Sequence, residues 1–145
     1  MDLPPPAPLS DRVRAFLEQP LYPSLATSGA DGEPHQAVIW YRLEPDDTIL
    51  VNSRQKRRWP EELQRGGRGS LAVTALDDPF NWVGLQCVVE EVIDDVAQSR
   101  EHIVELAHRY HPEGPTEKSI AMFRTQPRVT FLVRVTGIHD HLEDD

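Results

Sequence analysis

The sequence is poor in cysteine and has no long apolar run. Cys87 is the single cysteine in 145 residues, which excludes an internal disulfide and a zinc site built on cysteines. No apolar segment approaches the roughly 18 residues that a membrane-spanning helix requires. The opening segment MDLPPPAPLS has neither the basic nor the apolar region of a signal peptide. These absences predict a protein of the reducing cytoplasm with no membrane partner.

Positive charge is scarce as well. The chain carries 15 Lys plus Arg against 24 Asp plus Glu, which gives a net charge of −9. Sequence-independent binding to a phosphate backbone needs many cations, so we expect no nucleic acid as a partner. The same shortage disfavours a small interaction module built on a basic patch. The length fits one domain that buries a real core.

Four of the 15 cations fall within five residues, from Arg54 to Arg58. Residues 49–63 read ILVNSRQKRRWPEEL: an apolar run ends in an amide and a hydroxyl, and a basic turn follows. Pro60 and the acids after it predict the start of a helix. A strand end that delivers cations and free backbone N–H groups to a helix N-terminus suits an anion. The alternative interpretation is a solvated basic turn.

Residue periodicity predicts six strands and up to four helices. The strands cover residues 25–28, 35–43, 48–52, 70–76, 81–94 and 128–137. Helices are predicted over 11–19, 96–110 and 117–123, with a short one between the basic turn and Arg65. Hairpin-like connections predict an antiparallel sheet that forms a small barrel with peripheral helices. We expect a single domain, 1–145, with a Pro-rich tail over 1–9 and an acidic tail over 138–145.

Histidine and serine offer other chemistry, which their spacing does not support. The pairs His108/His111 and His139/His141 lack the HExxH context of a zinc site. No GxSxG nucleophile elbow is present. We therefore predict no metal site and assign no catalytic side chain. His35 stays open between a proton donor and a structural residue.

Four stretches carry a resemblance to a known family. They are LATSGADGEPHQAVIWYRL (25–43), ILVNSRQKRRWPEELQRGGRGSLAV (49–73), DDPFNWVGLQCVVEEV (77–92) and RVTFLVRVTGIHDHLE (128–143). Together they resemble the pyridoxamine 5′-phosphate oxidase-like split-barrel family, and most closely its deazaflavin (coenzyme F420)-dependent branch. The resemblance implies a mainly β, α+β fold: a six-stranded antiparallel split β-barrel of the FMN-binding type with peripheral helices. It also implies a homodimer with cofactor sites at the subunit interface.

The resemblance also implies a set of cofactor-binding residues. In the family, a strand end and an Arg-x-Lys turn hold the cofactor phosphate. On this chain those positions are Val51, Asn52, Ser53, Arg54 and Lys56, with Arg57 or Arg58 helping. The preceding strand lies against the flavin-type ring, which points to Val38, Ile39 and Trp40. The segment like FNW comes from the partner subunit, so Asn81 and Trp82 are expected to close the site.

The implied function is hydride transfer between coenzyme F420 and a small organic substrate. The F420 tail beyond the phosphate is anionic, and Arg57, Arg58, Arg65 and Arg68 supply further cations for it. Glu61 and Glu62 oppose that charge if they face the tail. Two alternatives stay open: an FMN-dependent oxidase or reductase of the same fold, and a flavin- or deazaflavin-binding protein without turnover. The sequence does not name the substrate.

Overall fold

Two long strands, β6 (Trp82–Ile93) and β7 (Arg128–His141), form the centre of one sheet in the computed structural model, which describes residues 2–143. Along β6, Val83, Leu85 and Cys87 are buried at every second position, as expected when successive side chains point to opposite faces. The alternation places one row of side chains of each strand in the core and the other row on the outer face.

Five further strands complete the sheet. They are β1 (Ser24–Ser28), β2 (Pro34–Val38), β3 (Tyr41–Leu43), β4 (Ile49–Arg54) and β5 (Arg68–Thr74). Neighbouring strands run antiparallel in the order β2-β1-β5-β6-β7-β4-β3. The predicted antiparallel barrel with peripheral helices is confirmed, but the sheet has seven strands rather than six.

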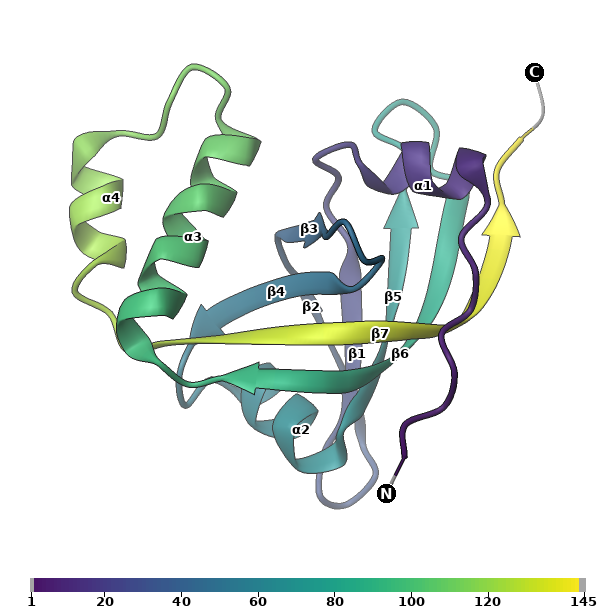
Figure 1. Ribbon diagram of the computed structural model, residues 1–145, viewed down its shortest axis with the longest axis horizontal. Helices are drawn as coiled ribbons and strands as arrows, with labels where there is room; N and C mark the ends of the chain where they lie inside the picture. Colours follow the sequence, from purple (N-terminus) through teal and green to yellow (C-terminus); the bar gives the residue numbers. More distant parts are fainter. Residues whose placement is uncertain (1, 144–145) are drawn as a thin grey trace.

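The extra strand arises from a break at Ile39 and Trp40, inside the single strand predicted over 35–43. β2 and β3 lie at opposite edges of the hydrogen-bonded order, although only these two residues separate them in the chain. The sheet therefore curls until its edges approach each other, and the chain crosses between them here (Figure 1). Ile39 is buried, and its N–H donates to the carbonyl of Pro23 at 3.1 Å.

Four helices lie around the sheet: α1 (Asp11–Leu17), α2 (Arg58–Gly66), α3 (Val96–Tyr110) and α4 (Glu117–Phe123). Capping side chains explain where three of them begin, since Ser10, Asp95 and Thr116 each accept a backbone N–H of the first turn. Figure 1 shows α3 and α4 together on one side and α2 at the lower end of the barrel. α3 packs on β4 and β7 through Leu50 and Leu106.

Both predicted tails are partly built into the fold. Near the N-terminus, the Ala7 N–H donates to the Val135 carbonyl at 2.8 Å, and Leu9 is buried. At the other end, β7 continues to His141 and pairs with β6, so part of the predicted acidic tail belongs to the sheet. Residues 144–145 lie outside the described range.

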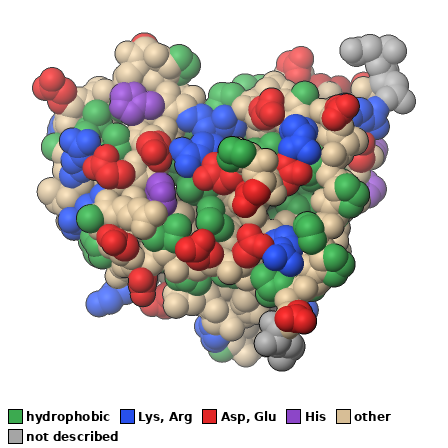
Figure 2. All heavy atoms as spheres, in the orientation of Figure 1, with side chains coloured by type: hydrophobic (Ala, Val, Ile, Leu, Met, Phe, Trp, Pro, Cys, Tyr) green, Lys and Arg blue, Asp and Glu red, His purple; other side chains and the backbone are tan. Residues whose placement is uncertain are grey.

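The surface of the molecule is mixed in charge on the face that Figure 2 shows, where acidic and basic side chains are interspersed. Within residues 2–143, none of the helices combines the length and the apolarity needed to cross a bilayer.

Candidate functional site

A cavity of about 220 Å³ opens where the end of β4 meets the start of β7. α2, α3 and the crossing between β2 and β3 supply the remaining walls. The cavity brings together several of the predicted cofactor-binding residues: Val38, Ile39, Trp40, Asn52, Ser53 and Arg57. It adds residues that the sequence did not point to: Tyr22, Trp59, Ile103 and Arg128.

Ser53, one of the residues that line this cavity, carries an unsatisfied hydroxyl. The side chain is only 3% exposed, and its Oγ has no hydrogen-bond partner among the described residues. Leaving a buried polar group unpaired costs about 1–3 kcal/mol, so native proteins rarely do so without reason. A bound group that accepts or donates a hydrogen bond would satisfy it.

Arg128 places a buried positive charge in the same wall. It is 8% exposed; its Nε donates to Gln126 Oε1 at 3.1 Å, and its Nη1 donates to Asn52 Oδ1 at 3.1 Å. The Phe123 ring lies 5.2 Å from the guanidinium carbon. Burial, together with the charges of Arg54 and Arg57, lowers the pKa of Arg128 to about 10. The group stays cationic at neutral pH, but in surroundings that penalise its charge.

Among the residues that the structure describes, no carboxylate pairs with Arg128. Arg54 stands directly opposite Arg128 in the β4–β7 ladder, a cross-strand pairing of like charges that is unfavourable. Within residues 2–143, neither these two arginines nor the cations of the basic turn, Lys56, Arg57 and Arg58, form an ion pair. An anion bound beside Arg128 would relieve the repulsion, and perturbed charges of this kind mark functional sites.

Part of the cavity wall is aromatic, because Tyr22, Trp40 and Trp59 line it. The Trp40 ring stacks on Tyr110, with ring centres 5.0 Å apart and planes 9° from parallel. The ring centre of Tyr22 lies 5.2 Å from that of Tyr110. Tyr110 is held in turn by its hydroxyl, which donates to the Leu21 carbonyl. A fixed aromatic surface beside an anion site suits a ligand that has a planar ring and a phosphate.

The structure does not bring the other predicted residues to the cavity wall. Val51 is 1% exposed and belongs to the barrel core. Arg54, Lys56 and Arg58 are exposed beside the cavity but do not line it. Lys56 adopts a left-handed backbone, with φ at 68°, which a residue with a side chain adopts at some cost.

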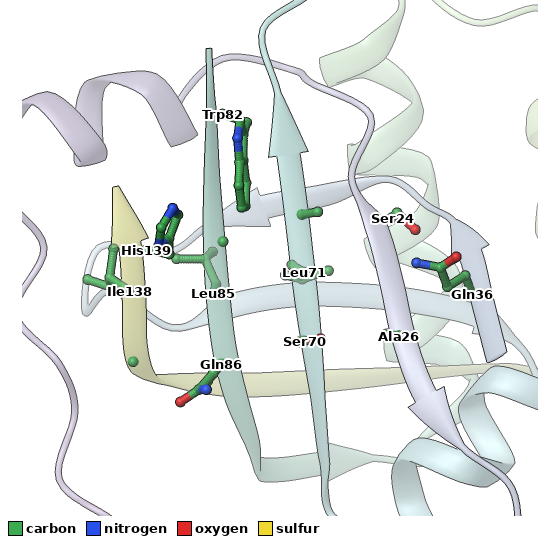
Figure 3. A pocket seen from close by; sticks show the side chains of 13 residues that line it. Ser24, Ala26, Gln36, Ser70, Leu71, Trp82, Leu85, Gln86, Ile138 and His139 are labelled. Carbon is green, nitrogen blue, oxygen red and sulfur yellow. The ribbon is translucent and has the colours of Figure 1, made fainter. Parts of the chain in front are cut away.

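Asn81 and Trp82 lie in a different place, on the outer face of the sheet. Trp82 lines a groove of about 420 Å³ (Figure 3). Its ring lies across Gly84, where an added Cβ would come within 3.0 Å, and it stacks on His139 at 4.9 Å. Asn81 Oδ1 accepts the backbone N–H of Glu143. Neither residue lines the Ser53 cavity.

The acids that follow the basic turn do not face the cavity. Glu62 is buried and accepts hydrogen bonds from Thr27 Oγ1 at 2.9 Å and from His35 Nδ1 at 2.8 Å. Burial raises the pKa of Glu62, but these bonds outweigh it and hold the pKa below its ordinary value. Glu61 is exposed and does not line the cavity. His35 therefore serves to bind α2 to the β1–β2 hairpin.

The family model described as pyridoxamine 5′-phosphate oxidase matches residues 9–138. The chain belongs to this family. The match covers six strands, most of β7 and the whole cavity, and it confirms the resemblance that the sequence stretches carry.

Solved structures with the same fold come from proteins with different names and functions. An F420 reductase is 24% identical, with a TM-score of 0.77, covering 90% of this chain and 98% of that one. A conserved hypothetical protein from Mycobacterium tuberculosis is 20% identical, with a TM-score of 0.70 and coverages of 94% and 87%. HutZ, the heme storage protein from Vibrio cholerae, is 13% identical, with a TM-score of 0.67 and coverages of 92% and 95%. At such identities these likenesses show the fold alone.

Proposed function

We propose that the protein is an oxidoreductase that binds coenzyme F420 and transfers a hydride between this cofactor and a small organic substrate. One observation carries the proposal: a single cavity joins the uncompensated Arg128 cation and the unpaired Ser53 hydroxyl to the Trp40 ring. A phosphate satisfies the first two groups, and a planar ring attached to it reaches the third. The F420 reductase of the same fold agrees with this assignment.

The residues of the chain bind and shield rather than react. Ser53 and Arg128 hold the phosphate, and Arg57 approaches it from the turn before α2. Trp40, with Val38 and Ile39, supports the ring and excludes water from one of its faces. Among the described residues that line the cavity, none is a carboxylate or a histidine. The bound cofactor supplies the hydride chemistry itself, which requires no side chain as a covalent catalyst.

Charge outside the cavity favours the deazaflavin over FMN. A single phosphate needs only the cavity cations, whereas the F420 tail extends further and carries additional negative charge. Arg54, Lys56 and Arg58 are exposed next to the cavity and form no ion pair within residues 2–143. They offer that tail a path along the basic turn. An FMN-dependent enzyme of the same fold is the second candidate.

Binding measurements distinguish the two cofactors. We expect F420 to bind more tightly than FMN, and its affinity to fall more steeply as salt rises from low to moderate, because its tail uses more charge contacts. Arg54→Ala should weaken F420 binding more than FMN binding. Arg124→Ala is the matched control, because Arg124 is exposed and pairs with Glu101 away from the cavity. FMN that copurifies and resists displacement by F420 would contradict the assignment.

A turnover assay then separates an enzyme from a carrier. Reduced cofactor is added to the protein with a panel of small organic acceptors, and its oxidation is followed by absorbance. Acceptor-dependent oxidation that is lost in a variant unable to bind the cofactor supports an enzyme. Tight binding with no oxidation by any acceptor would leave a binding protein without turnover.

We also propose that the protein functions as a homodimer. The cavity of about 220 Å³ is smaller than the roughly 300–1,000 Å³ of pockets that enclose a cofactor-sized ligand. A second protomer that supplies Trp82 and Asn81 would complete it. Mixing Arg128→Ala protomers with Trp82→Ala protomers should then restore cofactor binding in one intact site per mixed dimer. Failure of the mixture to exceed either variant alone would argue against shared sites.

A further inference from the structure

Asn52 lines the cavity, but its side-chain amide already forms hydrogen bonds with other residues of the protein. Its Nδ2 donates to the Ser99 carbonyl at 2.9 Å and to Thr130 Oγ1 at 2.9 Å. Its Oδ1 accepts from Arg128 Nη1 at 3.1 Å. An amide nitrogen has two protons, so Asn52 has no donor left for an anion.

The orientation of this amide has only one solution. The Ser99 carbonyl can only accept a hydrogen bond and the Arg128 guanidinium can only donate one, so nitrogen must face the first and oxygen the second. The arrangement continues outward, since Thr130 Oγ1 lies 2.8 Å from His102 Nδ1. Burial lowers the pKa of His102, which favours the neutral ring. The Asn52 amide is therefore fixed by partners on both sides.

Counting donors in the same way shows which N–H groups of Arg128 are already in use. A guanidinium has five N–H donors. Gln126 Oε1 accepts from Nε and Nη2, and Asn52 Oδ1 accepts from Nη1. One N–H on each terminal nitrogen remains without a partner among the described residues. Two free donors of this kind match the oxygens of a phosphate or sulfate group.

We propose that Asn52 is the positioning residue of the anion site: it holds the Arg128 guanidinium in the orientation that binds the anion and makes no contact with the anion itself. This proposal rests on the function proposed above, because it assumes that the cavity binds a phosphate. It assigns Asn52 a different role from Ser53, its neighbour on β4, whose hydroxyl is free.

A double-mutant cycle on sulfate affinity tests the proposal. Sulfate is the probe because its charge stays constant across the neutral range, and binding is measured calorimetrically. Arg128→Ala should weaken sulfate binding by about tenfold or more, and Asn52→Ala by about fivefold. If Asn52 acts only through Arg128, adding Asn52→Ala to Arg128→Ala has almost no further effect. Multiplied losses would show direct contact and overturn the proposal.

Two controls separate the outcomes. Gln98→Ala, an exposed amide deletion on α3, should leave sulfate affinity unchanged. If Arg128→Ala leaves sulfate affinity unaltered, the anion site and the proposed function are both contradicted. If the losses of the two single variants simply add, only the role proposed for Asn52 is contradicted. If Asn52→Ala does not fold, NMR of the unmodified protein decides. Added sulfate should shift the Arg128 guanidinium signals and leave the Asn52 amide protons almost unmoved; equal shifts would overturn the proposal.

Discussion

Replacing Ser53 by alanine should change stability and ligand binding in opposite directions. The hydroxyl is buried and has no partner in the described protein, so its removal eliminates an unsatisfied group. Leaving such a group unpaired costs about 1–3 kcal/mol. We take about 1 kcal/mol as the gain for Ser53→Ala, which raises the melting temperature of a domain of this size by about 4 °C without ligand.

On the proposed function, the same substitution also removes a hydrogen bond to the bound phosphate. Bonds to charged groups contribute about 1.5–3 kcal/mol, which corresponds to a loss of about tenfold or more in affinity. At saturating ligand the variant should therefore gain less thermal stability than the original protein. Thermal unfolding with and without F420, together with a fluorescence titration, measures both effects on one sample.

Ser99→Ala is the matched control, because it deletes the same hydroxyl where that group is in use. Ser99 is fully buried, and its Oγ donates to the Ile93 carbonyl at 3.0 Å. Its removal should lower stability by about 1 kcal/mol, since the carbonyl loses its partner. If Ser53→Ala lowers the melting temperature of the ligand-free protein as Ser99→Ala does, then the Ser53 hydroxyl is structural and our reasoning is refuted.

Three further predictions concern α2, the ring and the subunits. Glu62→Gln should lower the melting temperature at neutral pH and make it fall less steeply in acid. Burial opposes ionisation of Glu62, but the hydrogen bonds from His35 and Thr27 hold its pKa below the ordinary 4.5, so the original protein loses this stabilisation as pH falls below that value. Equal acid slopes of the two melting curves would contradict this. Trp40→Leu should weaken F420 binding by about fivefold while sulfate affinity stays constant, because it removes the ring surface and leaves the anion site; an equal loss of sulfate affinity would count against the division of the cavity. Light scattering at micromolar concentration should give a homodimer, and a monomer with full cofactor affinity would exclude a shared site.

Local signals predicted much of the fold. α3 and α4 begin and end where the sequence predicted, and in the structure Asp95 and Thr116 satisfy free N–H groups of their first turns. α2 begins earlier than Pro60, since Arg57 is its cap; Pro60 still falls in the first turn, where a missing N–H is tolerated. The break at Ile39 was not predictable, because it reflects the change of sheet edge.

The site was harder to predict because its members are distant in sequence. Ser53 and Trp40 were indicated by stretches that resemble the family, but Arg128 lies 76 positions from Asn52 and reaches it only through the β4–β7 register. No distinguishing signal marked Arg128 and Thr130, because Arg134 and Thr136 alternate with apolar residues in the same way further along the strand. The sequence indicated Asn52 as a phosphate contact, but adjacent residues in a sequence do not show which hydrogen-bond donors of a side chain the folded protein already uses.

The pairing of β4 with β7 also bears on how the protein is made. β4 leaves the ribosome well before β7, so the groups that we propose to bind the phosphate meet only after Arg128 has been synthesised. On this proposal, a chain that stops before Arg128 has no anion site. The ligand would then stabilise only chains that contain β7, because binding adds free energy only to the state that binds. Cofactor supply would protect these chains and leave shorter ones to proteolysis.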